Sequence, residues 1–437
     1  MTAVVAAAAA SPTRSPGRDR AVDLVRVFCV IGVVVLHAIM VGVTVTGSGP
    51  SFVNASDGTA WIVPVSWALQ VMPLFFIVGG FAGATAFRRS RARGGAAARF
   101  VAGRVHRLLL PAAVTVGVAG ALLGLLAAAG IPADLVALAG FRFAQPLWFL
   151  GVFLVCQALL PALLRCHERA PLRTLGVLAL LAGAVDVVRL ATGIDGIGFL
   201  NLAFVWLTLQ QVGFFLADGR IDALSRRSRA GAAAAAVALL AVSFASGLHS
   251  PDLVANINPP TTALLLVGVV HVALFSLVRA PLERLAARPG PARLVDFATP
   301  RAMTVYLWHM PVLLALAGLS AAASMLAGMP LPEVNGAGWW VSRPLWLALA
   351  LAATAAVAVP LSRIEARPAP AGTSSTTRVA VAVTTGTAGV ALLLVVGTSP
   401  VTAVAAVTAF AVALRLARTP LPHPRPGSHS LAAPALA

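Results

Sequence analysis

Residues 23–45 read DLVRVFCVIGVVVLHAIMVGVTV, a long apolar segment that carries charge where a lipid bilayer disfavours it. Asp23 and Arg26 stand at its start, and His37 follows eleven positions after Arg26. At roughly 100° per residue, a step of eleven in a helix returns to within about 20° of the same direction, so these side chains share one helical face. An ionisable residue inside a membrane helix is costly, and it is therefore a candidate for function.

The composition around this segment is that of a polytopic membrane protein. Of the 437 residues, 59% are apolar and only 11% are charged, and the mean hydropathy is +0.91. The formal charge of +18 comes from 32 basic residues, all of them arginine. Nucleic-acid binding would explain such a charge, but the arginines lie in short loops between apolar segments. That distribution is typical of loops on the cytoplasmic side of a membrane.

The apolar segments predict twelve membrane spans. Arginines crowd every second loop, whereas the loops on the opposite side hold only Arg142, Arg189 and Arg343. This alternation predicts an even number of spans with both termini in the cytoplasm. If the last two segments form only a re-entrant hairpin, the core has ten spans. The expected segments are 24–45, 61–87, 108–128, 147–164, 172–192, 198–217, 230–248, 260–278, 302–327, 341–362, 379–397 and 400–414.

The expected architecture is all-α, a helical bundle of about ten core transmembrane helices with one or two extra C-terminal helices. No stretch of the chain reads as a soluble catalytic domain, so any chemistry belongs to the membrane core or its two faces. The predicted organisation is a disordered cytoplasmic arm (1–20), a transmembrane domain (21–367), a linker (368–378), a C-terminal transmembrane hairpin (379–417) and a cytoplasmic tail (418–437).

His37 is expected about 20 Å into a helix that starts at the cytoplasmic side. It has two interpretations: a histidine hydrogen-bonded to a neighbouring helix, or a base that takes a proton from a hydroxyl. Asp23 and Arg26 stand three positions apart, a spacing that suits a local ion pair. Alternatively, Arg26 faces a phosphate or carboxylate. Because about 16 Å separates Arg26 from His37 along the helix, a donor with anionic phosphates and a long reactive arm would match that span.

Further candidates stand at the ends of other segments. Arg104 and Arg107 precede the third span, where they either orient the chain in the membrane or clamp a phosphate. Tyr306 and His309 stand three positions apart, one turn inside the expected cytoplasmic start of the ninth span, where His309 has either a structural or a functional role. Trp148 lies where the fourth span begins on the outer side.

Other residues are expected to be structural. Asp186 and Arg189, three positions apart in the fifth span, are expected to neutralise each other. The three cysteines Cys29, Cys156 and Cys166 show no metal-ligand spacing. The sequence also has no zinc signature, no phosphate-binding glycine loop and no nucleophile elbow, so no metal and no permanently bound cofactor are expected. The paired Gly79 and Gly80 are best explained by close helix packing.

In their order along the chain, these motifs resemble membrane acyltransferase family 3. The resemblance runs from about Arg18 to Arg367. Two departures stand out: Gly79 occupies a position where the family usually has serine, and two apolar segments follow the usual ten-span core. The matching motifs are Asp23-Leu24-Val25-Arg26 with His37, Met72 to Phe81, Arg104-x-x-Arg107 with Leu108 to Pro111, Gln145 to Leu150, Tyr306 to His309, and Ser362 to Glu365.

The resemblance implies transfer of an acyl group, often acetyl, from cytoplasmic acyl-CoA to a hydroxyl of a carbohydrate, a cell-envelope glycan or a small molecule. The family's roles would assign His37, together with Asp23, to catalysis. Arg26, Arg104 and Arg107 would bind the donor or hold the first helix in place. Tyr306, His309 and Trp148 would line the cavity. Both direct transfer and an acyl-histidine intermediate are consistent with this assignment. The expected partners are acyl-CoA, the hydroxyl acceptor and the lipid of the plasma membrane, without nucleic acid.

The alternative function is a multi-pass transporter of a carbohydrate, a lipid-linked intermediate or a carboxylated metabolite. Twelve spans and intramembrane charges are compatible with it. Transporters often have two similar halves, and the pattern of Asp23, Arg26 and His37 does not recur in the second half.

Overall fold

The computed structural model describes residues 19–419. Twelve of its helical segments are long and apolar enough to cross a membrane, which confirms the all-α polytopic fold. Large apolar side chains such as Leu180 and Val187 are exposed, as expected for surfaces that face lipid. Almost all of the predicted arm and tail lies outside the described residues.

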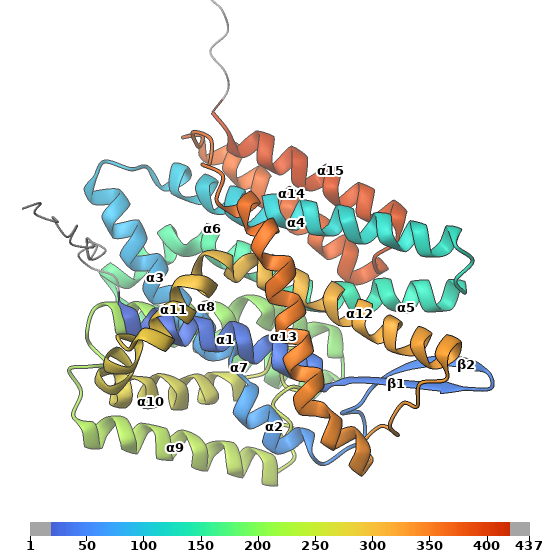
Figure 1. Ribbon diagram of the computed structural model, residues 1–437. Coiled ribbons are helices and arrows are strands. Elements are labelled where there is room, and N and C mark those ends of the chain that lie inside the picture. The colour runs from blue at the N-terminus through green and yellow to red at the C-terminus, as the bar shows by residue number, and fades with distance from the viewer. Residues whose placement is uncertain (1–18, 420–437) are drawn as a thin grey trace, which may run out of the picture. The chain divides into compact units, whose positions relative to one another are not determined.

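The chain folds into two compact units, each built from two separate stretches of sequence. The first unit comprises residues 19–85 and 162–363, and the second comprises 86–161 and 364–419. Three helices, α3 (Met72–Ala92), α6 (Trp148–Arg169) and α13 (Ala337–Glu365), run from one unit into the other. Figure 1 labels the elements. The other elements of the first unit are α1 (Arg20–Ile39), β1 (Val41–Thr46), β2 (Gly49–Asn54), α2 (Ile62–Leu69), α7 (Pro171–Thr192), η2 (Asp195–Leu200), α8 (Asn201–Ala217), α9 (Arg226–Ala245), α10 (Ala263–Ala286), α11 (Pro289–Ala298), η3 (Thr299–Arg301) and α12 (Ala302–Ala327).

Helix α1 is shorter than its apolar sequence predicted. Asp19 caps its first turn, because the carboxylate accepts a hydrogen bond from the backbone N–H of Val22 at 2.9 Å. The helix ends at Ile39, and residues 41–46 form strand β1, which pairs antiparallel with β2. Their β-branched Val and Thr residues favour a strand. Gly49, with φ of 112°, follows the turn in a conformation that a side chain would disfavour. The prediction of one helix up to residue 45 is therefore wrong.

The second predicted span consists of two helices, the short α2 and then α3. The chain leaves the helical conformation at Gln70, just before Pro73 in the first turn of α3. Proline has no N–H to donate to the preceding turn, so a new helix starts there more easily than an old one continues. The Gln70 side chain donates to the carbonyl of Leu253 at 2.7 Å, which fixes the break to the loop before α10.

Helices α3 and α8 cross at a pair of glycines. A Cβ on Gly80 would collide with the backbone carbonyl of Gln210, and one on Gly213 would collide with the carbonyl of Ile77. The absence of side chains lets the two backbones touch, as small residues do in membrane bundles. This confirms close packing at Gly80.

In the second unit, the C-terminal hairpin packs against the helix that carries Arg104 and Arg107. Helix α15 lies along α4, and α14 contacts both (Figure 1). Gly386 of α14 allows the Leu109 side chain of α4 to approach its backbone closely. The hairpin therefore contributes to the packing of this unit. The elements found only in this unit are α4 (Ala97–Ala128), α5 (Ala133–Ala144), η1 (Gln145–Leu147), α14 (Thr376–Val396) and α15 (Pro400–Ala417).

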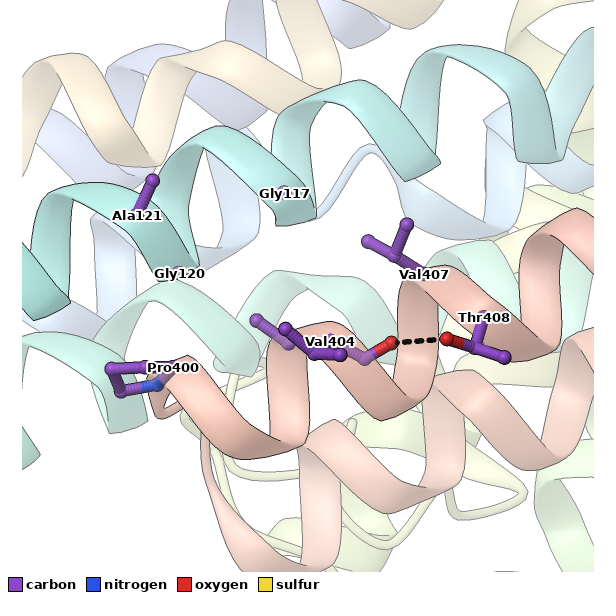
Figure 2. A pocket seen from close by; sticks show the side chains of 8 residues that line it. Gly117, Gly120, Ala121, Pro400, Val404, Val407 and Thr408 are labelled. Carbon is purple, nitrogen blue, oxygen red and sulfur yellow. Dashed lines mark hydrogen bonds between the residues drawn. The ribbon is translucent and has the colours of Figure 1, made fainter.

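A hollow of about 290 Å³ lies between α4 and α15. Figure 2 shows that small side chains leave this space. Its only side-chain hydroxyl, on Thr408, donates within its own helix to the carbonyl of Val404 at 2.8 Å. Because the lining is apolar and includes none of the predicted site residues, the hollow is not the candidate site. It is lined by Gly117, Gly120, Ala121, Pro400, Ala403, Val404, Val407 and Thr408.

Ending the chain after Arg367 should destabilise the second unit strongly. The truncation would expose buried side chains of α4, among them Leu109 and Val116, which α14 and α15 help to cover. Detergent-solubilised truncated protein should melt at a lower temperature and expose more protease sites in residues 86–161. Deleting only the tail after residue 419 is the control, and it should leave the melting temperature unchanged. Equal stability of the two truncated chains would contradict this role of the hairpin.

Candidate active site

The first helix carries an ion pair at one end. Asp23 lies in the first turn of α1 with only 7% of its surface exposed. The Arg26 guanidinium Nη1 lies 3.8 Å from the Asp23 Oδ1, so the local ion pair expected from their spacing forms. About a third of the Arg26 side chain (35%) is exposed. Arg26 is thus both paired with Asp23 and accessible to a further anion.

His37, in the last turn of the same helix, presents one ring nitrogen for chemistry. Its Nδ1 lies 2.8 Å from the carbonyl oxygen of Val33. A carbonyl only accepts hydrogen bonds, so Nδ1 carries the proton and a neutral His37 has its lone pair on Nε2. The side chain is half-buried. A half-buried imidazole with an unprotonated nitrogen has the form of a general base.

His309 of α12 has the same arrangement of its ring nitrogens. Its Nδ1 lies 2.5 Å from the carbonyl oxygen of Tyr306, the only tyrosine of the chain, so here too Nδ1 is the donor. The residue is fully buried, at 0% exposure. Its Nε2 has no hydrogen-bond partner within residues 19–419. A buried acceptor without a partner is unusual and points to a role in function.

The two imidazoles touch. Their ring centroids lie 5.0 Å apart, with an angle of 63° between the ring planes, in an edge-to-face contact. Both residues were predicted from the sequence as site residues, but their contact was not. His37 was expected about 20 Å deep and His309 one turn from the surface, and two touching rings cannot have both depths. Helix α12 nevertheless has the bounds predicted for the ninth span, 302–327, and α11 and η3 are separate elements that precede it.

Packing of the last turn of α1 against α12 and α13 keeps the rings together. Ala38 is fully buried in one cluster with Met310, Leu313 and Ala350. The indole N–H of Trp346 donates to the Ala38 carbonyl at 2.9 Å, which satisfies an acceptor at the end of α1. Trp346 was not among the site residues predicted from the sequence, where its only signal was a tryptophan within a mostly apolar span.

The remaining predicted site residues belong to the second unit. Arg104 of α4 is half-buried, with its guanidinium carbon 4.9 Å from the centre of the Phe100 ring, and Arg107 is exposed. Trp148 is the first residue of α6 and is half-buried. Within this unit the two arginines therefore differ in environment, although they stand one turn apart.

The expected neutralisation of Asp186 by Arg189 does not occur. Arg189 donates to Asp195 at 3.0 Å. Asp186 accepts hydrogen bonds from the backbone N–H and the hydroxyl of Thr262, both at 2.7 Å, and from the Asn201 amide at 2.9 Å. The carboxylate thus satisfies hydrogen-bond donors at the start of α10. It binds these groups instead of pairing with Arg189, three positions further along its own helix.

A family comparison identifies the reaction class. Residues 19–363 match the model of the third acyltransferase family, described as an acyltransferase domain. The chain belongs to membrane acyltransferase family 3. This acyltransferase is embedded in a membrane by its many apolar helices. Comparisons with curated proteins and with solved structures return no significant match.

The matched residues include every predicted site residue of this acyltransferase, and they end before α14. The C-terminal hairpin is therefore an addition to the family domain. Within residues 19–419, no three His, Cys, Asp or Glu side chains are grouped as metal ligands.

Proposed function

We propose that this acyltransferase moves an acyl group, most simply acetyl, from acyl-CoA to a hydroxyl of a carbohydrate, a cell-envelope glycan or a small molecule. The proposal places the protein in the plasma membrane with both termini in the cytoplasm, in accord with the alternation of arginine-rich loops. The observation that carries it is the contact between His37 and His309. In this pair both Nδ1 atoms donate to helix carbonyls, so both Nε2 atoms are left as proton acceptors.

In the proposed reaction, His37 acts as the base. Its Nε2 takes the proton from the acceptor hydroxyl as the oxygen attacks the thioester carbonyl. The new C–O ester bond forms, the C–S bond breaks, and the imidazolium returns the proton to the CoA thiolate. An acyl-histidine route uses the same Nε2 as a nucleophile. Intact-mass measurement after mixing the protein with acyl-CoA, without acceptor, separates the two routes, because only the second leaves an acyl group on His37.

The donor phosphates are assigned to arginines. Arg26 is exposed enough to meet an anion and lies about 16 Å along the helix from His37, within reach of a long thioester arm. Asp23 orients the Arg26 guanidinium through the ion pair. Arg104 and Arg107 retain a donor-binding role by family resemblance, and Tyr306 and Trp148 retain a cavity-lining one.

His309 is proposed to stabilise the protonated form of His37. A neutral imidazole with a buried lone pair lies against the ring that becomes positively charged, and buried electrostatic partners of this kind lower a barrier. His309→Ala should therefore reduce kcat by roughly tenfold to a hundredfold with a smaller change in KM. His309→Phe keeps the ring packing but removes the lone pair, so it should lose as much activity as His309→Ala. Full activity of His309→Phe would show that the ring serves only as packing.

Mass spectrometry of the acceptor pool tests the function itself. Envelope glycans and secreted metabolites are compared between cells that make the wild-type protein and cells that make His37→Ala. Wild-type cells should show an acyl increment that is missing from the variant, and deuterated acetate in the medium should shift its mass if the group is acetyl. Purified protein should also be stabilised against heat by acyl-CoA. Identical acceptor pools together with no stabilisation at millimolar donor would refute the proposal.

A further inference from the structure

The carboxylate of Asp19 joins the start of α1, the helix that carries His37, to α10. Asp19 caps α1 with one oxygen, which accepts from the Val22 N–H at 2.9 Å. Its other oxygen forms an ion pair with the guanidinium Nη2 of Arg279 in α10. Both side chains are mostly buried, with 15% and 22% exposed. A shielded charge pair holds its geometry more firmly than one in water.

Arg279 is at the same time tied to a third part of the fold. Its Nη1 pairs with Asp222, in the connection between α8 and α9, and its Nε lies 3.8 Å from Glu283. Its guanidinium carbon lies 5.7 Å from the Phe81 ring centre and 5.9 Å from that of Phe275. These contacts leave the arginine few alternative orientations.

Arg229 of α9 also contacts this group of charged side chains. It donates to the Ser276 carbonyl of α10 at 2.9 Å, and its Nη1 lies 3.9 Å from Asp222. Two arginines and two aspartates thus compensate one another's charge, with Glu283 at the edge. Because Arg279 already pairs with two carboxylates, it is poorly suited to bind a phosphate of the donor. Its contacts suit it better to hold neighbouring helices in position.

We propose that Arg279, acting through Asp19, is a positioning residue that fixes the start of α1 and thereby places Arg26 and His37. This inference rests on the proposed function for its catalytic consequence. A helix transmits a displacement of its first turn along its length, and the turn that Asp19 caps contains Asp23. Misplacement of reacting groups by about 1 Å can cost a hundredfold in rate.

Cys29 reports on the position of α1 without any need for activity. Its side chain lies in α1, one turn beyond Arg26, and is fully buried. In a Cys156→Ala, Cys166→Ser background, Cys29 is the only thiol of the chain. A membrane-permeant maleimide should label it slowly in the parent protein. Loosening of α1 should raise the labelling rate by roughly tenfold, because burial protects the thiol.

Two substitutions separate the ion pair from the helix cap. Asp19→Ser retains a capping oxygen for Val22 but loses the charge that binds Arg279. Arg279→Ala removes the other partner. We expect each to speed Cys29 labelling and to lower kcat by roughly tenfold or more, and the double variant to be no worse than Arg279→Ala alone. Arg279→Lys restores a point charge to one carboxylate at a time, so it should recover part of the kcat loss. Arg284→Ala, an exposed arginine of the same helix, is the charge-matched control and should change neither readout.

Faster Cys29 labelling in Asp19→Ser and Arg279→Ala, with non-additive losses of kcat, would support the proposal. Unchanged labelling, or fully additive losses, would overturn it. If wild-type protein transferred no acyl group at all, the proposed function would fail, while the labelling arm would still decide whether Arg279 fixes α1.

Discussion

His37→Ala should reduce acyl transfer by about a hundredfold to ten-thousandfold. The reaction needs a group that takes the hydroxyl proton as the thioester is attacked. His37 Nε2 is suited to do so, because the Val33 carbonyl holds the ring proton on Nδ1. Alanine removes the base, and His309 does not replace it, because its own side chain is fully buried.

The His37 variant should remain folded. The substitution removes one side-chain hydrogen bond within α1, worth about 1 kcal/mol, and the ring contact with His309, worth about 0.5–1.5 kcal/mol. Melting temperature and heat stabilisation by acyl-CoA should therefore stay close to the wild-type values. His271→Ala, which removes a half-buried histidine from α10, is the matched control and should retain activity. Wild-type rates in His37→Ala would exclude His37 as base and as acyl carrier.

Gly80→Ala and Gly213→Ala should be the most destabilising small substitutions in the first unit. Each added Cβ would overlap a backbone carbonyl, of Gln210 or of Ile77. A backbone carbonyl cannot change rotamer to relieve the overlap, as a side chain can. Overpacking of this kind typically costs about 1–3 kcal/mol, and more where backbone must move. Both variants should show lower yields of folded protein and lower melting temperatures in detergent.

Gly183→Ala is the control for these substitutions, because it adds the same Cβ at a helix position with open space. Gly183 lies inside the membrane helix α7, and an added Cβ would meet nothing within 4 Å. Because alanine is the better helix former by about 1 kcal/mol, this variant should be neutral or slightly stabilised. Destabilisation of Gly183→Ala as large as that of Gly80→Ala would show that the close crossing of α3 and α8 is not the cause.

The predictions that succeeded from sequence were those set by local chemistry. Apolar segments of about 20 residues predict helices in lipid, because the backbone must satisfy its own hydrogen bonds there. The family motifs around Arg26, His37 and His309 predicted the acyltransferase class that the family comparison confirms. The pairing of Asp23 with Arg26 followed from spacing on one helix.

The predictions that failed depend on contacts with other parts of the fold, which decide between two locally reasonable arrangements. Arg189 bonds Asp195, because Asp186 is occupied by the start of α10. Hydropathy cannot tell a helix from a strand, so residues 41–46 were assigned to the first span when they pair as a hairpin.

The sequence by itself determined that this protein is a helical membrane acyltransferase and which polar side chains share the face of its first helix. Hydrophobicity and helical periodicity are local properties, so they are readable along the chain. Only the tertiary structure decided that the His37 and His309 rings touch, and that Arg279 binds the carboxylate that caps α1. Contacts between distant helices depend on the packing of whole faces, which no single segment encodes.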